Sequence, residues 1–219
     1  MANFSGTVRL LTQSISPEDL QKDLERYYQV ALDDGNSSAA IIPANWVSLD
    51  ERVRLKCSIP KCYYYGECAS CPPYAPDVQF LRTAFSKYSW AIVIKNDVVP
   101  AEDLCNPEKI KLGSHIKHYV KTAKTVANIE KMAFADGHYL ALGLAAGCCK
   151  VYLCRNTMCQ VLDSGRCRHT LKARPSMESS SIDVFGLVAR LGWKGYPIYT
   201  TVDPAKVPLA MTVGIVFIR

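Results

Sequence analysis

The sequence lacks the features that would place it in a membrane or outside the cell. No apolar run approaches the roughly 18 residues of a membrane-spanning helix, and the longest candidate, YLALGLAAG at 139–147, has the length of a strand. The first residues, MANFSGTVRLL, lack a basic stretch followed by an apolar one, so we expect no secretory signal and a cytoplasmic protein. The sequence also contains no P-loop, no dinucleotide-binding fingerprint and no serine-nucleophile elbow.

The chain also lacks any linker rich in glycine, serine or proline. Its 219 residues, 49% of them hydrophobic, are enough to bury one sizeable core. We therefore expect a single α/β domain over residues 1–219.

The net charge of +6 is not spread evenly. Between positions 149 and 175 there is one carboxylate, Asp163, against six cations: Lys150, Arg155, Arg166, Arg168, Lys172 and Arg174. Elsewhere acids and bases nearly balance, which makes nucleic acid an unlikely partner. The pattern indicates a local anion site instead.

What the sequence has is cysteine, in two groups. Ten cysteines are too few for a small disulfide-rich scaffold, and a reducing compartment would keep them as thiols. The first group, in the loop at 51–76, is Cys57, Cys62, Cys68 and Cys71, spaced C-x4-C-x5-C-x2-C. Zinc and iron–sulfur clusters both accept four thiolates. The single short C-x2-C pair and the proline after Cys71 favour a cluster, with zinc as the alternative.

The second group lies in the loop at 147–178. Its predicted ligands are Cys149, Cys154, Cys159 and Cys167, spaced C-x4-C-x4-C-x7-C. Cys148 competes with Cys149 for the first position, because adjacent side chains diverge and rarely reach one metal together; we prefer Cys149.

A four-iron cluster held by four thiolates is an anion, and nearby cations favour its reduced form. The candidates for a second layer of residues around the cluster and its cysteine ligands are Arg166, Arg168 and Arg174. His169 is a candidate donor to a sulfur, and Glu178 a candidate ion-pair partner of Arg174. Alternatively these cations are solvated, or they form a docking patch for an acidic redox partner or an anionic substrate.

Alternating helix and strand patterns predict the fold. Helices are expected at 16–35, 78–88, 106–137 (with a possible kink at Gly113) and 181–192, and strands at 39–49, 90–99, 138–146, 196–202 and 211–219. Twice the order is strand, cysteine-rich loop, helix, strand. We therefore expect a mixed, partly parallel sheet flanked by helices, with both cysteine loops at one edge of the sheet. His115 and His118 share a face of the long helix and are interpreted as packing residues, and the isolated Cys105 as a small core residue.

Several motifs between residues 50 and 191 resemble a family of predicted metal-binding proteins from anaerobic bacteria and methanogenic archaea. They are KC, YG, CPPY, RPSME and IDV, together with the CRH that begins at Cys167. The resemblance implies a cytoplasmic iron–sulfur protein but supplies no reaction. This chain departs from the family pattern at Cys148, where the family has a small residue or proline, and in the late position of Cys154. The family also does not always have a cysteine at the position of Cys68.

The sequence thus predicts a protein with two four-iron four-sulfur clusters that transfers electrons at low potential to a partner enzyme. The first alternative is an enzyme with an open iron, of the sulfur-removal or dehydration type, if Cys68 is not a ligand. The second is a zinc-stabilised interaction module. The expected partners are a redox protein or a small anionic substrate. A homodimer is expected only because homodimers are the commonest oligomers of soluble proteins.

Overall fold

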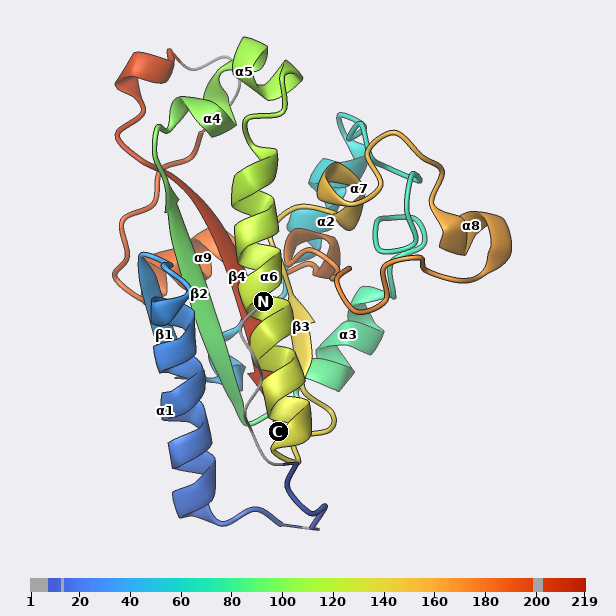
Figure 1. Cartoon of the computed structure of the whole chain (residues 1–219). Helices are drawn as coiled ribbons and strands as arrows, with labels where there is room; N and C mark the ends of the chain where they lie inside the picture. The colour runs from blue at the N-terminus through green and yellow to red at the C-terminus, as the bar shows by residue number, and fades with distance from the viewer. Residues whose placement is uncertain (1–7, 13, 199–202) are drawn as a thin grey trace.

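A four-stranded sheet forms the centre of the computed structural model, which describes residues 8–12, 14–198 and 203–219 (Figure 1). The strand order is β1-β2-β4-β3, and every neighbouring pair is antiparallel. The strands are β1 (Ser38–Pro43), β2 (Trp90–Val98), β3 (Leu142–Leu144) and β4 (Ala210–Ile218).

The expected partly parallel sheet is wrong. β2 and β3 do run in the same direction, as a strand–helix–strand unit requires, since each is antiparallel to β4. However, β4 lies between them and takes the hydrogen bonds that a parallel pair would have shared. Within the described residues, parallel pairing is limited to one isolated bridge between Ala145 and Ser176. The sequence pattern gave the direction of these strands but could not show that the last strand inserts between them.

Helices cover both faces of the sheet. α1 (Pro17–Asp33) and α6 (Ile116–Ala135) lie side by side on one face, where they bury Leu24, Tyr27, Val126 and Ile129 against β2 and β4 (Figure 1). On the other face α3 (Val78–Phe85) and α9 (Val184–Arg190) pack against a second cluster that includes Phe217 and Ile215. Alternate residues of β4 thus enter the two cores, as the period of a strand requires.

The remaining elements are short. They are α2 (Glu51–Ser58), α4 (Glu102–Cys105), α5 (Pro107–Lys111), α7 (Cys149–Tyr152), α8 (Gln160–Ser164), and the 3-10 turns η1 (Ala44–Trp46), η2 (Glu178–Ser180) and η3 (Pro204–Lys206). None of the described helices is both long and apolar enough to cross a membrane.

Local signals set most helix boundaries. The Ser16 and Asp77 side chains accept backbone hydrogen bonds at the starts of α1 and α3, as their positions predict. The helix expected at 106–137 is broken rather than kinked, because Gly113 adopts a left-handed φ of +87° between α5 and α6. β3 is shorter than the strand expected at 138–146. Residues 196–198 form no strand, and the rest of the strand expected at 196–202 lies outside the described residues.

Two glycines let α6 approach the sheet closely. A Cβ built on Gly143 of β3 would lie 2.6 Å from Cγ1 of Val126, and one on Gly214 of β4 would lie 2.6 Å from Cγ2 of the same residue. Val126, fully buried, therefore fits between two strands that have no side chain at this level. This close packing positions the start of α6, with Tyr119, beside the cysteine loops.

A buried charge network joins the start of α1 to the end of α6. Asp23 accepts hydrogen bonds from Arg9 at 2.7 and 3.1 Å and from Arg26 at 3.0 Å, and its carboxylate lies 3.1 Å from His138 Nε2. Burial opposes ionisation of Asp23, but these partners outweigh it and leave its pKa below the usual value. Burial lowers the pKa of His138. The network holds α1 against the turn that follows α6.

Candidate metal centre

The two cysteine-rich loops lie next to each other beyond the β3 edge of the sheet (Figure 1). The first begins in α2, which contains Cys57, and continues to position 76. The second leaves β3 through Gly147, whose φ of +62° is one that a side chain would strain. A Cβ there would also lie 3.3 Å from the Tyr119 ring. The turn at Gly147 directs the chain into Cys148 and the short helix α7.

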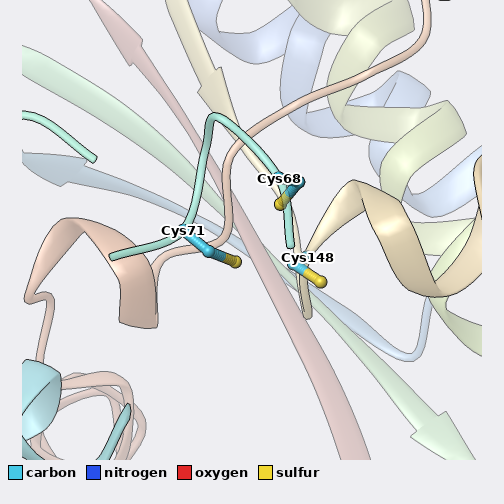
Figure 2. Close-up of side chains that lie close together, drawn as sticks. All are labelled: Cys68, Cys71 and Cys148. Atoms are coloured by element: carbon cyan, nitrogen blue, oxygen red, sulfur yellow. The ribbon is translucent and has the colours of Figure 1, made fainter. Parts of the chain in front are cut away.

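Three thiols from the two loops converge. The Sγ atoms of Cys68, Cys71 and Cys148 lie within 4.8 Å of one another, and Figure 2 shows the first two approaching Cys148 from a separate segment. All three side chains are buried, with exposed fractions of 1%, 8% and 7%. The group therefore combines both loops, and it includes Cys148, which the sequence interpretation had placed second to Cys149.

Cys149 adjoins this group through a serine. The Ser70 hydroxyl lies 3.4 Å from the Cys68 sulfur and 3.5 Å from the Cys149 sulfur. Cys148 itself has extended backbone angles, and Cys149 begins α7.

The three-thiol group lies between two cavities and contributes to the wall of each. The larger, of about 320 Å³, is lined by four cysteines: Cys57, Cys62, Cys71 and Cys148. The smaller, of about 20 Å³, is lined by five: Cys68, Cys149, Cys154, Cys159 and Cys167. Every cysteine except Cys105 therefore faces one of two neighbouring cavities. Cys105 is fully buried and donates to the Ala101 carbonyl at 3.4 Å, which supports its predicted role in the core.

The predicted quartets map unevenly onto these cavities. Cys149, Cys154, Cys159 and Cys167 all line the smaller one, as a single ligand set would. Three members of the first quartet line the larger cavity, while the fourth, Cys68, faces the smaller one. Both quartets stay predictions as metal-ligand sets.

The adjoining thiols hold their protons unequally. Hydrogen bonds from Cys148, Cys149 and Cys71 hold the pKa of Cys68 well below its usual range. Hydrogen bonding to Cys148 raises the pKa of Cys71, and hydrogen bonding to Cys68 raises the pKa of Cys149, and that of Cys148 to about 12. One thiolate is thus favoured within the group, and the others ionise when a cation replaces their protons.

Cations and amide donors surround the smaller cavity. Lys150 is buried and lines it, with Nζ 2.6 Å from the Thr157 carbonyl and 3.7 Å from a Glu67 oxygen. Arg168 also lines it and donates to Thr157 Oγ1 at 3.0 Å. His169 donates through its backbone amide, rather than its ring, to the Cys167 sulfur at 3.3 Å.

The remaining predicted second-layer residues lie elsewhere. Arg174 pairs with Glu130 of α6, not with Glu178 as expected, because the loop crosses the side of α6 before it turns toward η2. Glu178 is exposed at the edge of the larger cavity. Arg166 is exposed and lines neither of these two cavities.

The two histidines of the long helical pattern have different surroundings. His118 is buried with Nε2 3.0 Å from Asp103 Oδ2, which fits the predicted packing role. His115 lines the larger cavity, and its buried Nδ1 has no hydrogen-bond partner among the described residues.

The distances limit what the three-thiol group can hold. Thiolates on one tetrahedral ion lie about 4 Å apart, given a Zn–S bond of about 2.3 Å, whereas thiolates on different irons of a cuboidal cluster lie roughly 6 Å apart. Cys68, Cys71 and Cys148, all within 4.8 Å, therefore fit one mononuclear ion. A cuboidal cluster that binds any two of them requires those two thiols to move apart.

Sequence reasoning ranked Cys148 below Cys149 and named Lys150 only as one of the cations of the second loop. The sequence did contain a signal for Cys148. If two adjacent cysteines cannot bind the same metal, each of them can still bind a different one of two neighbouring sites. Lys150 carries no such sign, since only the fold shows that its stem is buried beside Cys149.

The site and fold together define a thiol-rich metal-binding protein. The chain belongs to the family described as predicted metal-binding protein (DUF2284), whose model matches residues 40–218 and so includes all ten cysteines. No curated protein and no solved structure matches the chain.

Proposed function

We propose that this chain is a cytoplasmic iron–sulfur protein that holds two four-iron four-sulfur clusters, one in each cavity, and transfers electrons at low potential to a partner enzyme. The observation that carries the proposal is that nine cysteines line two adjoining cavities, four around one and five around the other. Both cavities therefore have the four thiols that a cuboidal cluster takes as ligands.

The larger cavity suits such a cluster best. Its volume of about 320 Å³ exceeds what a four-iron core needs, and Tyr64 and Tyr119 form part of its wall. The smaller cavity, at about 20 Å³, holds little more than one water-sized sphere. A cluster there requires its walls to move apart. The wall that can do so is α8, a helix of five residues, none of which is buried.

The shared wall supports a transfer role. Thiols that face different cavities lie within 4.8 Å of one another, so clusters bound by them are close enough for electrons to pass between them. The clusters supply one-electron redox chemistry when bound. The chain's own residues influence the reduction potential. Lys150 and Arg168 place positive charge beside the smaller cavity, which favours the reduced state of a cluster bound there.

Anaerobic purification tests this proposal. We expect a brown protein with about eight irons and eight acid-labile sulfides per chain, because two cuboidal clusters contain that number. After reduction, two paramagnetic signals should appear. A Cys105→Ala variant serves as the matched control, since this buried cysteine faces neither cavity, and it should retain both. A colourless protein without sulfide contradicts the proposal.

A single zinc site is the second candidate. It is favoured by the 4.8 Å grouping of Cys68, Cys71 and Cys148, which fits one tetrahedral ion directly. It leaves six further cysteines around the cavities without a role, which is why we rank it second. One zinc per chain and no iron would establish it.

A further inference from the structure

We propose that the two cysteine loops exchange thiols: the cluster in the larger cavity is held by Cys57, Cys62, Cys71 and Cys148, so that its fourth ligand comes from the second loop. Cys68, although it lies in the first loop, belongs to the smaller cavity with Cys149, Cys154, Cys159 and Cys167. This inference rests on the proposed two-cluster function and refines which thiols serve which site.

The adjacent pair in the second loop carries the first step of the argument. Cys148 lines the larger cavity and its neighbour Cys149 lines the smaller one. Cys148 has extended backbone and Cys149 begins α7, and the two neighbouring thiols line different cavities. The chain thus enters the wall between the cavities at this point and contributes one thiol to each.

The C-x2-C pair of the first loop is divided in the same way. Cys71 lines the larger cavity, whereas Cys68 lines the smaller one. Ser70 strengthens this division, because its hydroxyl lies within 3.5 Å of both the Cys68 and the Cys149 sulfurs. Cys68 is thereby joined to the site of the second loop.

The sulfur–sulfur distances do not by themselves divide the three thiols. Cys68, Cys71 and Cys148 lie within 4.8 Å of one another, so Cys71 and Cys148 have to move apart to bind different irons of one cuboidal cluster. The cavity walls assign Cys71 and Cys148 to one side and Cys68 to the other. The larger site then has four thiols without Cys68, and the smaller one has four without it as well, so Cys68 is a fifth thiol held beside the second cluster.

Alanine variants in the full chain test this exchange. Cys62→Ala defines the signal of the larger site, and Cys167→Ala that of the smaller. We expect Cys148→Ala to lose the signal that Cys62→Ala loses, with about half of the iron, and to keep the signal that depends on Cys167. We expect Cys68→Ala to keep the signal that depends on Cys62. Cys105→Ala is the matched control for replacing a buried cysteine, and it should keep both signals.

Two results would overturn the exchange: loss of the Cys62-dependent signal in Cys68→Ala, or its retention in Cys148→Ala. The proposed function fails separately, if the unmodified protein contains no iron and sulfide.

A second measurement avoids the variants, in case one does not fold. The anaerobic wild-type protein is exposed to limiting oxidant, so that one cluster is lost before the other. Free thiols are then alkylated and located by mass spectrometry. Cys148 should become reactive together with Cys57, Cys62 and Cys71. Reactivity of Cys148 together with Cys154, Cys159 and Cys167 contradicts the exchange.

Discussion

Replacing Gly143 by alanine tests whether the contact between α6 and the sheet is as close as described. The added Cβ would lie 2.6 Å from Val126 Cγ1, about 1 Å closer than ordinary carbon contact. Gly143 has no left-handed φ, so the backbone itself tolerates alanine. The cost is therefore overpacking, which typically amounts to about 1–3 kcal/mol. We expect a loss of about 2 kcal/mol in the free energy of unfolding, measured by urea denaturation, and a Tm lower by roughly 4–8 °C.

A double-mutant cycle with Val126→Ala is the control for this prediction. Removing both Val126 methyl groups leaves a space that the new Cβ can enter, so Gly143→Ala should cost less than about 0.5 kcal/mol in that background. An equal cost of Gly143→Ala with and without Val126 would refute the reasoning, because the destabilisation would then not arise from their contact.

Three further predictions concern charge. Lys150→Met removes the buried cation beside the smaller cavity, so the reduction potential of one signal in anaerobic titration should fall by on the order of 50 mV, whereas Arg166→Gln, at an exposed position, should leave both potentials unchanged. Glu130→Gln leaves the largely buried guanidinium of Arg174 without its carboxylate, and it should lower the free energy of unfolding by about 1–2 kcal/mol; an unchanged urea midpoint would contradict this. Because burial lowers the pKa of His138, the unfolded chain binds an extra proton as the pH falls below about 6.5. Stability should therefore decline from pH 7 to pH 5, and urea midpoints measured across this range should decline less in His138→Gln.

The sequence predicted the elements of the fold better than their arrangement. The capping residues Ser16 and Asp77 and the β-branched run of β2 identify their helices and strand, because these signals act within a few residues. The antiparallel sheet depends on β4 inserting between β2 and β3, which is a contact between residues far apart in the chain. The pattern of β4 is the same whichever neighbours it has, so no local signal could reveal this.

The prediction of the candidate site had the same limit. Cysteine spacing identified both loops and the set Cys149, Cys154, Cys159 and Cys167, which the structure places around one cavity. It could not show that Cys68 and Cys71 line different cavities, because spacing gives the reach of a side chain but not its direction. The pairing of Arg174 with Glu130 was missed for a related reason: Glu178 is nearer in sequence, and only the path of the loop beside α6 brings Glu130 closer.

The common partition between the cavities makes the two loops structurally dependent on each other. Cys71 and Cys148, separated along the chain by four helices and two strands from α3 to β3, stand on the same wall. Oxidative damage that begins at either centre would loosen a boundary of its neighbour, so in air the second centre should be lost faster once the first has gone.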